Sequence, residues 1–124
     1  MLQKLLLVLS FTLFAYAQDE IKWNKSFDDL DGSKSFVLVE ENYCPWCDRF
    51  KAQVLKDSQV QKALQEFELF SIMKRPWNKM GIVHGHVRFV PTLIFLDENK
   101  RVTKRHDGFM DKDEFLQMIE KLKE

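Results

Sequence analysis

Residues 36–47, FVLVEENYCPWC, decide how this chain folds. They open with Phe36-Val37-Leu38-Val39, an aromatic and β-branched run that predicts a buried strand. After four intervening residues come Cys44 and Cys47, separated only by a proline and a tryptophan. From Cys47 to Leu55 the apolar residues fall at helical spacing. The sequence therefore predicts a strand, a short loop and a helix that begins at the cysteine pair.

The position of the two cysteines predicts redox chemistry. A helix N-terminus presents free N–H groups and the positive end of the helix dipole, so a thiolate at Cys44 is stabilised there. Pro45 suits the first helical turn, because no N–H is needed at that position. The spacing lets Cys47 close a small disulfide with Cys44. We predict that Cys44 is the attacking thiol and that Cys47 resolves the mixed disulfide.

Residues 1–17, MLQKLLLVLSFTLFAYA, have the three parts of a secretory signal peptide. Lys4 supplies the positive charge, Leu5–Phe14 is the apolar run, and Ala15-Tyr16-Ala17 fits the cleavage pattern. The apolar run is shorter than the roughly 20 residues that span a bilayer, which disfavours a membrane anchor. We expect a mature domain of residues 18–124 that is periplasmic or secreted. Outside the cytoplasm a thiol pair can persist as a disulfide.

Composition excludes several classes of protein. The 124 residues suffice for one domain, and 45% of them are hydrophobic, unlike a disordered chain. Nineteen basic residues balance 19 acidic ones, so the strong positive charge of a nucleic-acid-binding domain is missing, and we predict no nucleic-acid partner. Two cysteines are too few for a disulfide-rich miniprotein or for a four-thiolate zinc site.

The remaining sequence predicts alternating strands and helices. Hydrophobic spacing and turn residues give each element. The Asp111-Lys112-Asp113-Glu114 run is a capping box that starts a terminal helix. The other expected strands are Ile21–Trp23 (weak), Phe67–Met73, Thr92–Leu96 and Arg101–His106; the other expected helices are Ser26–Leu30, a short one carrying Val60, Ala63 and Leu64, and one around Trp77–Ile82.

These features make the sequence resemble the thioredoxin superfamily, and specifically its exported bacterial members. The resemblance rests on Cys44-Pro45-Trp46-Cys47 behind a hydrophobic strand, on Val90-Pro91-Thr92 ahead of a strong strand, and on Gly108 before an amphipathic helix. It covers about residues 21–122. It implies an α/β thioredoxin-like fold with a central mixed β-sheet flanked by helices. It also implies a thiol-disulfide oxidoreductase that needs no metal and no organic cofactor.

The resemblance changes the prediction for Pro91. Only about 5–6% of X–Pro bonds in folded proteins are cis, so physical reasoning alone favours a trans bond. The resemblance implies a cis-proline beside the cysteine pair, and a backbone at Val90 that pairs with an extended substrate segment. Trp46 is a further candidate for substrate contact, because aromatic residues are enriched at interfaces. The alternative for Trp46 is packing over the start of the helix.

One departure from the family concerns proton transfer. Typical thioredoxins carry a buried aspartate six residues before the first cysteine, and Leu38 stands there in this chain. Glu40 and Glu41 lie nearer the cysteines, and Glu40 continues the alternation of Phe36 and Leu38. We consider either glutamate a possible acceptor of the Cys47 proton. The alternative is that both are solvated at the end of the strand.

A second departure concerns the direction of electron flow. The dedicated oxidases of the superfamily often have Pro-His between the cysteines, and Trp46 cannot stabilise a thiolate as an imidazolium does. We therefore favour a reductant of protein disulfides, recharged by a membrane redox partner, over an oxidant. The mature chain lacks an obvious dimerisation domain, which favours a monomer.

Two further alternatives belong to other classes of protein. Cys44, Cys47 and His86 together would suit a copper- or zinc-handling protein. His84 and His86 are better explained as loop residues, because no further ligand is evident, and we predict no metal. A redox-inert interaction module is the weaker alternative.

Overall fold

A computed structural model describes residues 23–24 and 32–123. In this part of the chain, four strands form one mixed sheet in the order β2-β1-β3-β4. Strand β1 pairs in parallel with β2 and antiparallel with β3, and β3 pairs antiparallel with β4. The strands are β1 (Ser35–Glu40), β2 (Glu68–Met73), β3 (Thr92–Leu96) and β4 (Val102–Asp107). The predicted mixed sheet is confirmed.

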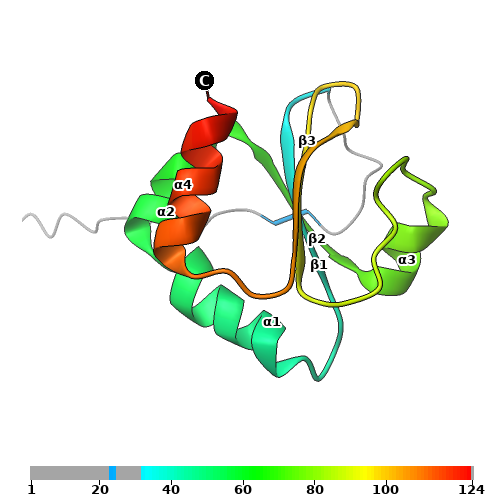
Figure 1. Cartoon of the computed structure of the whole chain (residues 1–124), viewed down its shortest axis with the longest axis horizontal. Coiled ribbons are helices and arrows are strands. Elements are labelled where there is room, and N and C mark those ends of the chain that lie inside the picture. Colours follow the sequence, from blue (N-terminus) through cyan, green and yellow to red (C-terminus); the bar gives the residue numbers. More distant parts are fainter. Residues whose placement is uncertain (1–22, 25–31, 124) are drawn as a thin grey trace, which may run out of the picture.

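Helices cover both faces of this sheet (Figure 1). The first helix continues into a π-helical segment, and the second ends in a single 3-10 turn. Helices α1, α2 and α4 lie on one side of the sheet and α3 on the other. The elements are α1 (Pro45–Phe50), η2 (Lys51–Leu55), α2 (Ser58–Ala63), η3 (Leu64–Glu66), α3 (Lys74–Lys79) and α4 (Lys112–Leu122). Within the described ranges no helix is long and apolar enough to cross a membrane.

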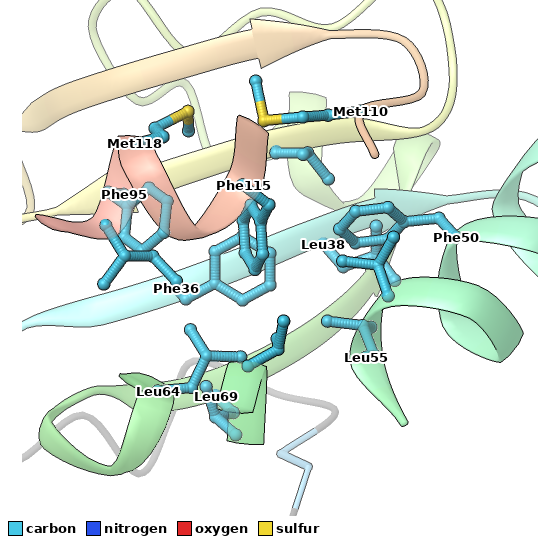
Figure 2. Close-up of a cluster of buried hydrophobic side chains, with 14 residues drawn as sticks. Phe36, Leu38, Phe50, Leu55, Leu64, Leu69, Phe95, Met110, Phe115 and Met118 are labelled. Atoms are coloured by element: carbon cyan, nitrogen blue, oxygen red, sulfur yellow. The ribbon is translucent and has the colours of Figure 1, made fainter. Parts of the chain in front are cut away.

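Alternate side chains of β1 divide the core into two clusters. Phe36 and Leu38 belong to the larger cluster, between the sheet and helices α1, α2 and α4. Figure 2 shows this cluster, in which the Phe115 ring of α4 lies 5.4 Å from the rings of both Phe36 and Phe50. The smaller cluster, on the opposite face, holds Val37 and Val39. A strand buried on both faces explains the continuous hydrophobic run in the sequence.

Aspartate side chains cap helices α2 and α4 by accepting backbone N–H groups. Asp57 Oδ1 caps α2 by accepting from the N–H groups of Gln59 and Val60. Asp111 Oδ1 caps α4 by accepting from the N–H of Glu114 at 2.9 Å. This confirms Asp111 as the predicted N-cap.

The predicted helix at Trp77–Ile82 was misplaced. Helix α3 begins at Lys74, so Pro76 lies in its first turn, where a missing N–H costs nothing. The helix ends before Gly81, whose φ of 63° is a left-handed conformation that glycine adopts without a steric penalty. The predictions for residues 1–17, Ile21–Lys22 and Ser26–Leu30 lie outside the described residues.

Candidate active site

The two cysteines lie where β1 gives way to α1. Cys44 is the N-cap residue of α1, and its Sγ accepts from the N–H of Cys47 at 3.1 Å. A disulfide joins the two residues, whose Cα atoms are 5.2 Å apart. Cys44 is 9% exposed, whereas Cys47 is completely buried. A partner molecule approaching from solvent therefore reaches the sulfur of Cys44 first.

The loop before β3 lies beside the cysteine pair. Val39 near the end of β1 pairs with Thr92 at the start of β3, so Pro91 is adjacent to the segment that leads to Cys44. The peptide bond between Val90 and Pro91 is cis. Its surroundings are tied to the neighbouring strand, because the Pro91 carbonyl accepts from the N–H of Gly108 at 2.7 Å.

Val90 presents an open backbone edge in this loop. No hydrogen bond joins its N–H or its C=O to another residue within the described ranges. The residues around it are held in place, since Thr92 Oγ1 donates to the carbonyl of Phe89 at 2.7 Å. A backbone that is fixed but unpaired has the geometry needed for an added strand.

Two side chains of α3 hold the preceding loop, residues 81–90. Trp77 Nε1 donates to the carbonyl of Gly85 at 2.6 Å. Asn78 Nδ2 donates to the carbonyl of Val87 at 2.8 Å, and Asn78 Oδ1 accepts from the N–H of Val87 at 2.8 Å. This clamp is not predictable from the sequence, because an Asn inside a helix gives no indication of a partner nine residues away.

The two glutamates at the end of β1 lie in different environments. Glu40 is only 4% exposed, accepts from Ser71 Oγ of β2 and forms an ion pair with Lys51 Nζ. Glu41 is exposed and forms an ion pair with Lys74 Nζ at 3.1 Å. Lys51 follows Cys47 by four residues, which is about one helical turn. The buried carboxylate of Glu40 is thus linked to the helix that carries Cys47.

Trp46 both packs and faces solvent. It is 52% exposed, and its ring centroid lies 5.5 Å from that of Phe109. The Arg49 guanidinium lies over the same ring, 4.6 Å from its centroid. The two alternatives for Trp46 therefore do not exclude each other, because one side of the indole packs while much of it stays accessible.

His84 and His86 lie in the clamped loop and are both exposed. In residues 23–24 and 32–123 no three His, Cys, Asp or Glu side chains are grouped so that they could hold a metal ion. The copper or zinc alternative thus gains no support from the geometry of the described residues.

Comparison with known proteins agrees with this arrangement. The family model described as a thioredoxin-like domain matches residues 29–123. This chain belongs to the thioredoxin-like family. The thiol:disulfide interchange proteins DsbD of two Haemophilus influenzae strains, PittGG and Rd, are 34% identical to it over 118 residues. That match covers 86% of this chain and 20% of each DsbD, so the chain spans about a fifth of these relatives' length.

Solved structures share the fold. A thioredoxin from Thermus thermophilus has a TM-score of 0.62 and 24% identity, covering 73% of this chain and 74% of that one. The periplasmic thioredoxin SoxS from Paracoccus pantotrophus has a TM-score of 0.60 and 18% identity, covering 73% and 95%. The C-terminal domain of DsbD from Neisseria meningitidis has a TM-score of 0.58 and 17% identity, covering 72% and 79%.

Together these observations place the chain among the thioredoxin-like oxidoreductases. It carries its two cysteines as a C-x-x-C pair, and it is similar to part of the DsbD proteins. The predicted fold and enzyme class are confirmed.

Proposed function

We propose that this protein reduces disulfides of other proteins outside the cytoplasm, with Cys44 as the attacking thiol and Cys47 as the resolving thiol. The observation that carries the roles of the two cysteines is their difference in exposure, 9% against 0%. The direction of electron flow rests on Trp46 between them, which cannot stabilise a thiolate as an imidazolium does. A substrate sulfur can approach Cys44, whereas Cys47 is reached only from within the protein.

The reaction has two exchange steps. The Cys44 thiolate attacks one sulfur of the substrate disulfide, forms a mixed disulfide, and releases the first substrate thiolate, which takes up a proton. Cys47 then loses its proton, and its thiolate attacks Cys44 Sγ. This step releases the second substrate sulfur as a thiolate, which takes up a proton, and forms the Cys44–Cys47 disulfide. Two electrons have passed from the cysteine pair to the substrate.

Glu40 is our candidate for the group that accepts the Cys47 proton. Its carboxylate is buried and lies against Lys51, one helical turn beyond Cys47 on the chain. Glu41 is the weaker candidate, because it is exposed and its ion pair with Lys74 directs it elsewhere.

The substrate would bind along the open backbone edge at Val90 as an added strand. Pro91 follows Val90 directly and leads into β3, and Trp46 offers an accessible aromatic surface near Cys44. These contacts would position a substrate cysteine in front of Cys44 without any cofactor.

The setting of the reaction is also part of the proposal. Residues 1–17 have the pattern of a cleavable signal peptide, and residues 18–124 would form the mature protein. The likeness to a periplasmic thioredoxin supports an exported protein. In an oxidising compartment a reductant needs a supply of electrons, so a membrane redox partner would recharge the pair. We propose that the protein acts as a monomer.

The equilibrium reduction potential of the purified protein tests the direction of electron flow. Reference potentials run from about −270 mV for thioredoxin to about −120 mV for a strong oxidant. A value near the lower end supports a reductant, and a value near the upper end makes the protein an oxidant. Cys47→Ser should trap a mixed disulfide on Cys44, whereas Cys44→Ser should trap none. A trapped disulfide on Cys47 instead would reverse the two roles.

A further inference from the structure

The surface around Cys44 carries large exposed apolar side chains on both sides. Tyr43, immediately before Cys44, is fully exposed, and Trp46 is half exposed. Phe89, next to Val90 in the loop, is 70% exposed. We call Tyr43, Trp46, Phe89 and Val90 the apolar strip. Exposed aromatic side chains around a reactive group are typical of a surface that contacts other proteins.

Two arginines flank this strip. Arg49 lies on the α1 side, where its guanidinium stacks on Trp46. Arg88 lies on the loop side, two residues before Val90, and is exposed. Its backbone is placed near the end of β1, because Lys74 Nζ is within 3.5 Å of the Arg88 carbonyl and also binds Glu41. Neither arginine forms an ion pair with a carboxylate of the described chain.

The nearby carboxylates do not cancel this charge. Glu40 is buried and paired with Lys51, and Glu41 is paired with Lys74. Asp48, next to Arg49, is exposed and forms no ion pair within the described residues. The surface around Cys44 therefore carries two positive charges without an ion pair, Arg49 and Arg88, and one such negative charge, Asp48. This local excess stands out in a chain of 19 basic and 19 acidic residues.

We propose that this surface selects acidic partner segments: an extended strand paired on Val90, with Asp or Glu side chains that meet Arg88 and Arg49 on either side of the reacting cysteine. The proposal rests on the proposed thiol-disulfide exchange and adds a substrate class to it. Arginine suits this role, because its planar fork binds a carboxylate through two parallel hydrogen bonds. Complementary charge at the rim of an interface acts mainly on the rate of association and on the choice of partner.

Two matched peptides test the proposal. Each carries one cysteine as a mixed disulfide with 5-thio-2-nitrobenzoate; one has glutamates on both sides of the cysteine and the other has lysines. When the Cys44 thiolate of the reduced protein attacks the peptide sulfur, the coloured thionitrobenzoate leaves and gives the second-order rate constant. At low ionic strength we expect the glutamate peptide to react at least about tenfold faster, with a ratio that falls as salt screens the charges.

Substitutions locate the effect. Arg49→Gln and Arg88→Gln should each lower the ratio about two- to fivefold, as loss of an exposed ion pair does, and the double variant should bring it close to one. Asp48→Asn should raise the ratio, because it removes the opposing charge. Arg101→Gln is the matched control: Arg101 is exposed and follows the end of β3 that pairs with Ser35, at the far end of β1 from Cys44.

The outcomes separate this proposal from the proposed function. If neither peptide reacts, and the mixed disulfide of 2-mercaptoethanol with thionitrobenzoate does not react either, disulfide exchange itself is refuted. If both peptides react quickly at equal rates, only the acidic selectivity is overturned. The acidic selectivity is also overturned if the lysine peptide reacts faster. The same holds if Arg101→Gln lowers the rate ratio as much as Arg88→Gln does.

Discussion

Replacing Asn78 by alanine should loosen the loop that carries the proposed substrate-binding edge. The substitution removes both hydrogen bonds from the side-chain amide to the backbone of Val87, each 2.8 Å long. Val87 is only 1% exposed, so its N–H and C=O would lose their partners in a buried place. A buried polar group without a partner costs about 1–3 kcal/mol. With water entering the vacated space, we expect a total loss of about 2–4 kcal/mol for the two groups.

Urea unfolding of Asn78→Ala measures this loss directly. For a slope of about 2 kcal/mol per molar urea, the midpoint should fall by about 1–2 M. Asn78→Asp should also destabilise, because a carboxylate oxygen then faces the Val87 carbonyl in place of the amide donor. Asn99→Ala is the control, since Asn99 is exposed in the β3–β4 turn and its side chain makes no hydrogen bond within the described chain.

Asn78→Ala should slow exchange with peptides but not exchange with small reagents. Exchange with a peptide substrate should slow in Asn78→Ala, because the Val90 edge is no longer held in place. Reduction of the Cys44–Cys47 disulfide by dithiothreitol should keep its rate, since the small reagent does not use that edge. An unchanged urea midpoint in Asn78→Ala would refute the clamp. A loss of dithiothreitol reactivity equal to the loss of peptide reactivity would refute the link to substrate binding.

Three further substitutions test the core, a helix cap and the proton acceptor. Phe115→Ala should lower the free energy of unfolding by about 3–5 kcal/mol, because it empties the centre of the aromatic cluster; a loss below 1 kcal/mol in thermal unfolding would contradict the packing described. Asp57→Ala should cost about 1 kcal/mol in the same assay, since it removes the N-cap of α2, and no change would mean that the cap is dispensable. Glu40→Gln should slow release of the mixed disulfide by Cys47 on the order of a hundredfold at neutral pH, and a normal rate would exclude Glu40 as the acceptor.

The strands and the cysteine pair were predictable, because the pattern that indicates each of them lies in consecutive or nearly consecutive residues. The run Phe36–Val39 lies inside β1 (Ser35–Glu40), and the predicted Thr92–Leu96 strand has the bounds of β3. The Asp111 cap likewise depends on residues three apart. In each case all the residues that form the pattern lie within a few positions of one another.

Contacts between distant segments were not predictable in this way. Glu40 and Ser71 are 31 residues apart, and only the parallel pairing of β1 with β2 brings them together. The hydrogen bond from Ser71 and the ion pair with Lys51 distinguish the buried Glu40 from the exposed Glu41. The alternation along the strand alone did not decide between them. The start of α3 was missed for a local reason: Pro76 suggests a break in the chain, although it is tolerated in a first turn.

The edges of the two outer strands of the sheet are protected in different ways against pairing with a further strand. Along β2, Asn24 already occupies part of the edge: its N–H donates to the Leu69 carbonyl at 2.8 Å, and its carbonyl accepts from the Ser71 N–H at 3.0 Å. At the other edge, β4 carries Lys104 and Arg105, whose charges another copy of the chain would have to desolvate in order to dock. Charged edges of this kind oppose the stacking of sheets into aggregates. In our proposal the protein accepts a foreign strand at the Val90 edge, whereas the charges on β4 oppose self-association along that edge of the sheet. Lys104→Val combined with Arg105→Val should therefore increase self-association.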